Sequence, residues 1–392
     1  MSYTIPEVEL LALCARTDHN GETRKKIVTL LAAKPDWEPF VSLVIQHGLT
    51  PLVYRTLRSL AAGLIPGDIL QAFDIHCAAT AELNRSMTEE LLEMLDLLGR
   101  HDVVPIVFKG PSFGQEIYGD SALRAFGDLD FLIDQSEFEK TRCLLRDIGY
   151  REHSSLSPRR ERAILHKQGQ WGLTSPYGTV VEPHWKFAFH SMSVQLDYPG
   201  IRCRARTIEL SGQPVQVLGK EDILLIMCIH GCKEEWRVLR QVCDVAETVR
   251  AFPALDWEGL CRSASEQGCE RILFTGLLLA QKMLDAPVPE EILSKIQRDL
   301  HTPRLVQKIE TRLSKGERKT LQSGHFALSR FLVRERLSDK FRYAYRTAFS
   351  PREAHFQFID LPDRLFFLYY LIKPLHDYLL LPLWRGYQRL SR

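Results

Sequence analysis

The stretch VFKGPSFGQEIYGDSALRAFGDLDFLID, residues 107–134, contains the features that decide the fold. A Lys-Gly pair follows an apolar run, a segment of helical length comes next, and Asp128 and Asp130 then stand one residue apart among hydrophobic residues. Because a strand sends alternate side chains to opposite faces, Leu129 and Phe131 face one side and both aspartates face the other. Such a pair either binds a metal ion or faces solvent on a half-exposed strand.

The regions on either side of this stretch differ in their hydrophobic pattern. Residues 1–100 place apolar side chains at helical spacing throughout, and the same pattern returns after Glu221. Between them stand short strand-like runs and a Pro-Tyr-Gly turn typical of a hairpin. We therefore predict a mixed α/β (α+β) fold: a small mixed sheet in a core over 101–218, an N-terminal helical region over 1–100 and a C-terminal helical domain over 219–392.

Composition limits the class of protein. The 392 residues include 51 basic and 49 acidic ones, and a net charge of +2 argues against long nucleic acid as a partner. The nine cysteines are odd in number and form no C-x-x-C pair, which is typical of reduced core residues in a cytosolic protein. The first residues lack the basic and apolar segments of a signal peptide, so we expect a cytoplasmic location.

The C-terminal segment 365–392 raises the question of a membrane. Its run LFFLYYLIKPLHDYLLLPLW is apolar, but Lys373, Pro374, His376 and Asp377 interrupt it, and a membrane span needs about 20 clean apolar residues. One interpretation is a buried helix pair broken at Pro374. The other is peripheral contact with a membrane or a partner protein, for which the arginines that follow suit an anionic surface.

The two aspartates suit a site for divalent cations. On one face of a strand they stand roughly 7 Å apart, and hard cations such as Mg²⁺ prefer carboxylate oxygens. The strand is otherwise apolar, so ionised groups on it need a reason. A glycine turn one helix length earlier lets backbone N–H groups approach a phosphate, and Lys109 or Ser112 adds donors. Downstream, TVVEPHWKF supplies Glu182 on a strand.

His184 and Lys186 share a strand face with Glu182 by the same two-residue period. A strand, a glycine turn, a helix, an Asp-x-Asp strand and a later acidic strand together match the parts of a two-metal phosphoryl-transfer site.

This order of motifs resembles the polymerase-β-type nucleotidyltransferase superfamily, whose pattern is a Gly-[Gly/Ser] turn, a helix, an Asp-x-Asp strand and a third acid on a neighbouring strand. More closely, it resembles a bacterial branch of uncharacterised nucleotidyltransferases with the pattern LKG…LYGD…R…GDIDLLV…GY…(E/D)LHW…H…K…W…D. The matching residues are Lys109, Gly110, Tyr118, Gly119, Asp120, Arg124, Gly127, Asp128, Asp130, Gly149, Tyr150, Glu182, His184, Trp185, His230, Lys233, Trp236 and Asp244.

The resemblance implies a polymerase-β-like core and assigns roles to these positions. Asp128, Asp130 and Glu182 would bind one or two Mg²⁺ ions and form the catalytic set, with Glu182 also the candidate general base. Nucleotide binding would fall to a second group, namely Lys109, Gly110, Ser112, Arg124, His184, Lys186 and Lys233. Gly110 and Ser112 would hold the β- and γ-phosphates, and Arg124 would bind a phosphate or carboxylate.

Two prolines depart from the branch pattern. Pro111 removes a backbone N–H from the phosphate turn. Pro183 cannot donate to a neighbouring strand, which predicts that the Glu182 strand lies at an edge or contains a bulge.

Several residues also allow a purely structural interpretation. His184 with Trp185 would also fit a packing pair, and Asp120 a turn cap. His230, Lys233 and Asp244 stand at helical spacing, where a His-Asp interaction inside a bundle competes with nucleotide contact.

The predicted function is Mg²⁺-dependent transfer of a nucleoside monophosphate, AMP from ATP, to an unidentified acceptor with release of pyrophosphate. The acceptor would be a small molecule, a peptide or a protein hydroxyl, and the branch suggests a peptide or polysaccharide biosynthetic pathway. The alternative is a catalytically weak or inactive protein of the same fold that binds or scaffolds a partner.

Overall fold

The computed structural model describes residues 5–152, 156–187, 192, 194–195, 197–316, 328–381 and 383. The N-terminal region is helical, as its periodicity predicts. Side chains of Asn20 and Asp36 cap two of its helices by accepting backbone N–H groups. The helices are α1 (Pro6–Cys14), α2 (Gly21–Ala32), α3 (Trp37–Gln46), α4 (Thr50–Ala61) and the long α5 (Gly67–Arg100), with a short turn η1 (Ala62–Leu64) before α5.

A mixed sheet follows, in the order β3-β4-β5-β2-β1-β7-β6. Its strands are β1 (Ile106–Val107), β2 (Asp128–Leu132), β3 (Arg151–Glu152), β4 (Leu173–Thr174), β5 (Val180–His184), β6 (Arg206–Leu210) and β7 (Gln213–Val217). The pairs β2–β5 and β1–β7 are parallel, and the other neighbours are antiparallel. This arrangement confirms the predicted mixed α/β class.

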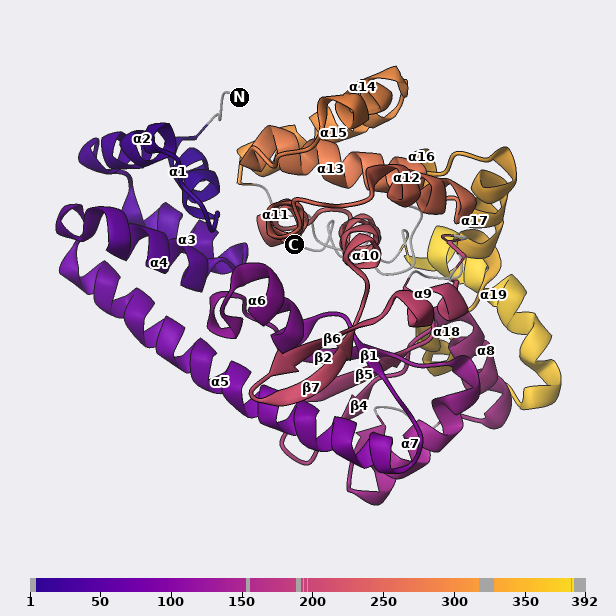
Figure 1. The fold of residues 1–392 in the computed structure, drawn as a ribbon. Helices are drawn as coiled ribbons and strands as arrows, with labels where there is room; N and C mark the ends of the chain where they lie inside the picture. The colour runs from indigo at the N-terminus through magenta and orange to yellow at the C-terminus, as the bar shows by residue number, and fades with distance from the viewer. Residues whose placement is uncertain are drawn as a thin grey trace.

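Helices connect the strands and surround the sheet (Figure 1). The helix predicted between the Lys-Gly pair and the Asp strand is α6 (Gly110–Tyr118), which ends at Gly119 with a φ of 77°. The remaining connecting helices are α7 (Phe138–Asp147), α8 (Pro158–Gln168) and α9 (Tyr198–Arg204), with short turns η2 (Ser121–Leu123) and η3 (Gln135–Glu137). The predicted hairpin around Pro176-Tyr177-Gly178 is formed by β4 and β5.

The prediction that the Glu182 strand lies at an edge is wrong. β5 lies inside the sheet between β4 and β2. The Pro183 carbonyl accepts a hydrogen bond from the Trp171 N–H, so the Pro183 nitrogen faces the Trp171 side of β5 and not β2. On that side the two-residue β4 pairs only with Val180 and Val181, so Pro183 lies beyond its end. The missing donor therefore removes no hydrogen bond from the β2–β5 ladder.

In the part of the chain that the structure describes, the segments after residue 219 are mainly helical. Its helices are α10 (Lys220–Lys233), α11 (Leu239–Ala251), α12 (Trp257–Glu266), α13 (Glu270–Leu284), α14 (Glu290–Arg298), α15 (Thr302–Ser314), α16 (Leu328–Leu332), α17 (Leu337–Phe349), α18 (Glu353–Phe358), η5 (Asp363–Leu368), α19 (Tyr369–Leu375) and the π-helical turn η6 (His376–Leu380).

The chain does not break at Pro374. That proline lies inside α19, and η6 continues directly from it. A π turn accommodates the donor that proline lacks. The segment is also not buried as a whole, because Phe367, Leu371 and Leu379 are more than half exposed. Among the described residues, no helix is long and apolar enough to cross a membrane. Residues 384–392 of the predicted contact segment lie outside the described part.

Two apolar clusters hold the molecule together. The first joins residues of α1 to α4, α6 and α10 to α15, and therefore draws on all three predicted regions. The second lies around the sheet and joins the end of α5 to β2, β5 and β7, together with Phe356, Phe366 and Tyr369 from the C-terminal helices. All nine cysteines are free thiols, and six of them are buried.

Candidate active site

The parallel pairing of β2 and β5 places the predicted carboxylates beside one another. Asp130 is the register partner of Glu182, and Leu132 is the partner of His184. Residues paired in this way share a sheet face, so Asp128, Asp130, Glu182 and His184 all project from the same side. The opposite face is apolar, with Leu129 and Phe131 in the core around the sheet. The predicted alternation of β2 is therefore confirmed.

Asp130 is the buried centre of this group, with a side chain only 1% exposed. One carboxylate oxygen accepts a hydrogen bond from His184 Nε2 at 2.7 Å, and the other lies 3.2 Å from Lys109 Nζ. Burial alone would raise the pKa of Asp130, but the charges of Lys109 and His184 outweigh it and hold the pKa far below its usual range. Burial lowers the pKa of His184, but its hydrogen bonds to carboxylates, first of all the bond to Asp130, outweigh burial and raise the pKa.

Asp128 is the first residue of β2, lies on the same face and is only partly buried. Burial raises its pKa, and the neighbouring charges of Asp130 and Glu182 raise it further. Three like charges held together in this way destabilise one another unless a cation joins them. The electrostatics of Asp128 therefore indicate a group positioned for a ligand and not for the stability of the apoprotein.

Glu182 is linked to the helical domain through a residue that the sequence did not single out. Gln170 donates from Nε2 to Glu182 at 2.5 Å and accepts from Lys233 Nζ at 2.9 Å. His184 Nε2 also lies 3.5 Å from Glu182. Lys233, at the end of α10, is thus brought next to Gln170 and Glu182. Gln170 gave no sequence signal because it lies in an irregular segment after α8, and only the fold brings it to β5.

The glycine turn lies against the start of β2. Gly110 is the first residue of α6 and has a φ of 65°, and a side chain on it would contact the backbone of Asp128. The N-terminus of α6 is therefore next to the carboxylates, and Pro111 occupies a first-turn position where its missing N–H has no helical partner anyway. Ser112 is buried and its hydroxyl donates to the Lys109 carbonyl at 3.1 Å.

Arg124 has a structural partner that we did not predict. Its guanidinium makes two hydrogen bonds to Asp244, at 2.8 and 2.9 Å, and the Tyr118 hydroxyl donates to the same carboxylate at 2.8 Å. Asp244 comes from α11, which packs on α6. Burial would raise the pKa of Asp244, but Arg124 outweighs it and the pKa is lowered. This ion pair connects the segment just before β2 to α11.

The remaining predicted residues are distributed as follows. Asp120 caps η2 by accepting the Ala122 N–H at 2.8 Å, in agreement with the turn interpretation. Trp185 packs on Phe138, with ring centroids 4.7 Å apart. The ammonium of Lys186 points away from the carboxylates and donates to the His166 carbonyl at 3.3 Å.

The His-Asp interaction considered for the bundle is not formed, because Asp244 pairs with Arg124 instead. His230, at the same helical spacing, has its pKa lowered well below the usual value by burial and then by Lys109 and Lys233.

The donor set fits a divalent cation. Ligand atoms of Asp130, Glu182 and His184 lie within 4.8 Å of one another. Asp130 Oδ2 is buried, and its ion-pair partner is the Lys109 ammonium 3.2 Å away, a position that a bound cation would share. Oxygen-rich sets of this kind suit Mg²⁺ or Mn²⁺. In the protein alone, Lys109 and His184 supply the positive charge that an ion would bring.

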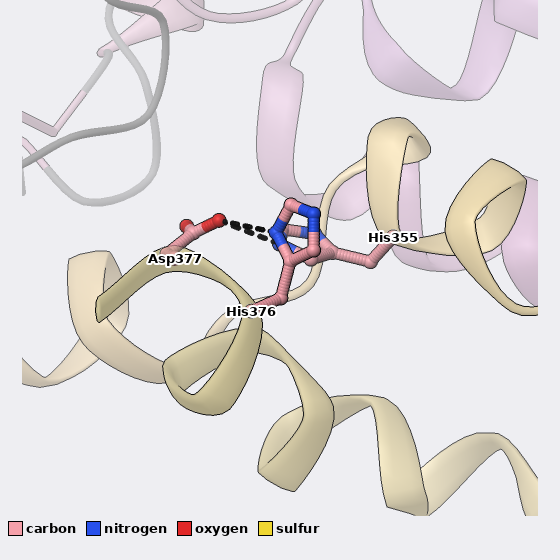
Figure 2. Close-up of side chains that lie close together, drawn as sticks. All are labelled: His355, His376 and Asp377. Carbon is pink, nitrogen blue, oxygen red and sulfur yellow. Dashed lines mark hydrogen bonds and ion pairs between the residues drawn. The ribbon is translucent and has the colours of Figure 1, made fainter. Parts of the chain in front are cut away.

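A second group of potential ligands lies far along the chain, where His355 and His376 both contact Asp377 (Figure 2). Two further cations contact the same carboxylate: Arg352 at 2.5 Å and Lys373 at 3.2 Å. Burial would raise the pKa of Asp377, but these neighbours lower it far below its usual range. With this much positive charge already present, the group is an internal ion-pair cluster and not a metal site.

Comparisons with known proteins place the sequence in a family. A protein-family model described as "uncharacterised nucleotidyltransferase" matches residues 33–285, a span that includes Lys109, Asp128, Asp130, Glu182 and Lys233. No curated protein matches the sequence. Among solved structures, the chain is similar to an antigenic nucleotidyltransferase-like protein from Paracoccidioides brasiliensis, with 14% identity, a TM-score of 0.28, and coverage of 56% of this chain and 96% of that chain. Because the family match covers well over half of its length, the chain belongs to the uncharacterised nucleotidyltransferase family.

Proposed function

We propose that the protein is a Mg²⁺-dependent nucleotidyltransferase that transfers a nucleoside monophosphate, AMP from ATP, to an acceptor hydroxyl. The observation that carries the proposal is the register of Asp130 with Glu182 on neighbouring parallel strands, with Asp128 on the same face. Three carboxylates on one face, next to a helix N-terminus, form the arrangement that phosphoryl transfer with divalent cations needs.

In this proposal Asp128, Asp130 and Glu182 hold the metal, which supplies charge stabilisation to the phosphates when it is bound. The N-terminus of α6 at Gly110, with Lys109 and Lys233, positions the triphosphate beside the carboxylates. The acceptor oxygen forms a bond to the α-phosphorus, the bond to the β-phosphate oxygen breaks, and pyrophosphate leaves. Glu182 accepts the acceptor proton, since its side chain is partly exposed and oriented by Gln170.

Arg124 has a different part in this proposal from the phosphate contact that the resemblance implies. Its guanidinium donates two hydrogen bonds to Asp244. The guanidinium also lies against the ring of Phe113, with the ring centroid 5.0 Å away. We infer that Arg124 is a positioning residue that fixes the segment before Asp128. Lys186 likewise has no phosphate contact in this proposal, because its ammonium donates to the His166 carbonyl.

Product analysis tests the proposal. The protein is incubated with isotopically labelled ATP and Mg²⁺, with extracts of small molecules and peptides as acceptors, and both the protein and the acceptors are examined by mass spectrometry. We expect pyrophosphate and a mass increase of one nucleoside monophosphate on an acceptor or on the protein itself. ADP in place of pyrophosphate would assign a phosphotransferase. Activity that persists in Asp130→Asn would contradict the proposed site.

One observation favours the alternative function, a binding or scaffold protein with weak or no catalysis. Both oxygens of Asp130 already face cations of the chain, Lys109 and His184, so the fold is satisfied without a metal. In that case ATP with Mg²⁺ would not stabilise the protein against thermal unfolding, because a ligand stabilises only a state that binds it.

A further inference from the structure

A second candidate site lies outside the carboxylate group, where α8 faces the end of α17. The structure has a pocket there of about 650 Å³. Five basic side chains line it together with Tyr370: Arg159, Arg162, His166, Lys167 and Arg346. Among the described residues that line it, none is acidic. Figure 1 shows α8 next to α18 and α19, at the side of the sheet.

The helix spacing concentrates these charges on one face. Arg159, Arg162, His166 and Lys167 stand at i, i+3, i+7 and i+8 of α8, positions that lie on one side of a helix. Like charges at this spacing destabilise a helix unless something neutralises them. Arg159 donates to the Asp363 carbonyl at 3.0 Å and Arg162 to the Pro158 carbonyl at 3.2 Å. Carbonyl contacts orient a guanidinium without cancelling its charge, so these two guanidinium groups stay cationic.

Lys167 is a half-buried member of the group. It donates to the carbonyls of Ser350 and Pro351 at 3.4 and 3.2 Å. Burial, followed by the charges of Lys373 and Arg352, lowers the pKa of Lys167 to about 7, while Asp377 opposes the shift. The cluster around Asp377, drawn in Figure 2, thus includes the two cations that disfavour the protonated form of Lys167. An anion in the pocket would stabilise the protonated form of Lys167.

Exposed apolar side chains stand next to lining residues of the pocket in the sequence. Tyr370 lines the pocket and is 43% exposed, and Leu371 next to it is 59% exposed. On the α17 side, the exposed rings of Phe341, Tyr345 and Phe349 contact one another in series. Contiguous exposed apolar surface is unusual on a soluble protein and marks a binding surface.

We propose that this pocket binds the phosphate group of an anionic ligand, in addition to the nucleotide site. Clustered arginine and lysine side chains with a pre-oriented fork geometry are the chemistry that recognises phosphate. Two sources share that chemistry: a soluble phosphorylated compound and the headgroup of an anionic lipid whose acyl part would meet the exposed rings. The inference does not depend on catalysis, because none of the carboxylates on β2 and β5 lines the pocket.

Binding of inorganic tripolyphosphate in excess EDTA tests the site, since removal of divalent cations separates it from the metal-dependent one. The pocket variant is Arg162→Gln/Arg346→Gln. The matched control is Arg24→Gln/Arg262→Gln, which removes the same charge from exposed positions elsewhere. We expect the pocket variant to bind about tenfold more weakly or worse, as loss of charge-assisted hydrogen bonds implies, and the control to bind like wild type. Equal weakening in both variants would overturn the proposal.

Vesicles distinguish the two sources. Co-sedimentation with phosphatidylglycerol vesicles, but not with phosphatidylcholine vesicles, assigns a lipid headgroup when the pocket variant loses it. Binding of tripolyphosphate without vesicle binding assigns a soluble ligand. If wild type binds neither probe, the proposal fails. Asp130→Asn should bind tripolyphosphate in EDTA like wild type, so a failure of the nucleotidyltransferase proposal is recognised separately.

Lys167→Arg provides a test that does not depend on losing the fold or the charge. Arginine stays protonated, whereas Lys167 with a pKa of about 7 loses its proton in alkaline buffer. We expect the affinity ratio of Lys167→Arg to wild type to grow on the order of tenfold between about pH 6 and about pH 8.5. Because the probe and the other lining residues are the same in both experiments, an unchanged ratio would contradict a role for Lys167 in the pocket.

Discussion

At the residue scale, the protein without a bound ion contains a carboxylate, Asp128, whose charge does not stabilise the fold. Asp130 is satisfied by Lys109 and His184, but Asp128 has a raised pKa because burial and two neighbouring carboxylates disfavour its charge. A carboxyl group of this kind stabilises the fold only while it is protonated, and that contribution is lost as pH rises through its folded pKa. A charged group that works against stability is typical of ligand sites.

Asp128→Asn should therefore stabilise the protein in the absence of metal. We expect the free energy of unfolding at neutral pH to rise by about 1 kcal/mol, because the substitution removes a repelled charge and keeps the shape. In acid, where Asp128 is protonated in both states, the difference should disappear. Denaturant unfolding in EDTA measures it. The control is Asp147→Asn, an exposed carboxylate at the end of α7, which should change little.

The Arg124–Asp244 pair makes a second prediction at this scale. Asp244→Ala leaves a buried guanidinium and the Tyr118 hydroxyl without their acceptor. Breaking a buried pair from one side typically costs about 3–5 kcal/mol, so we expect a large decrease in melting temperature. Removing both charges in Arg124→Leu/Asp244→Leu should restore part of the loss. A single variant as stable as wild type would contradict the structural role assigned to Arg124.

The sequence identified the acids together with Lys109 and His184, but not the other contacts of the site. The alternation of Asp128 to Ile133 defines the face of β2 from local pattern alone, and the register with Glu182 confirms that face. Gln170 and Asp244 could not be found in this way, because each reaches the site from a helical or irregular segment through tertiary packing. Nothing local in a sequence encodes which buried arginine a buried aspartate will meet.

At the element scale, the turn into α6 requires a glycine. Gly110 has a φ of 65°, a conformation in which a side chain adds about 1–2 kcal/mol of strain. Gly110→Ala should therefore lower the free energy of unfolding by about that amount and weaken ATP binding, because the N-terminus of α6 shifts. Gly99→Ala, in the last turn of α5 with open space around it, should instead be neutral or stabilising. Thermal unfolding of both variants checks the contrast.

The same scale shows where local rules failed. Pro183 and Pro374 both predict a boundary, and neither forms one. In β5 the proline nitrogen faces the side beyond the short β4, and in α19 a π turn follows the proline. The N–H that proline lacks ends a helix or strand only where a hydrogen-bond acceptor would have paired with it. Whether such an acceptor is present depends on neighbouring segments, which the local sequence does not specify.

At the scale of the whole molecule, the three predicted regions are not independently packed. The first apolar cluster joins α1 to α4 with α6 and with α10 to α15, and the second joins the sheet with α5 and the C-terminal helices. The sequence located these regions from changes in periodicity, but it could not show that they share cores, because sharing depends on long-range contacts.

We therefore expect the chain to unfold as one unit. Far-ultraviolet circular dichroism and tryptophan fluorescence should report the same melting temperature, since loss of either cluster exposes apolar surface from every region. Leu224→Ala, a fully buried residue of α10 in the first cluster, should lower that single transition in both signals. Two transitions that separate, with only one of them shifted by the substitution, would show that the regions fold independently.

The central claim is that the carboxylates of β2 and β5 bind a divalent cation and, with it, a nucleotide. Thermal unfolding in the presence of ATP, with and without Mg²⁺, tests it most directly on wild type, Asp130→Asn and the exposed control Asp147→Asn. The account predicts that ATP with Mg²⁺ stabilises wild type and the control, by about 2.7 kcal/mol at a hundredfold excess over Kd, and leaves Asp130→Asn unchanged. Equal stabilisation of all three proteins, or of none, would contradict it.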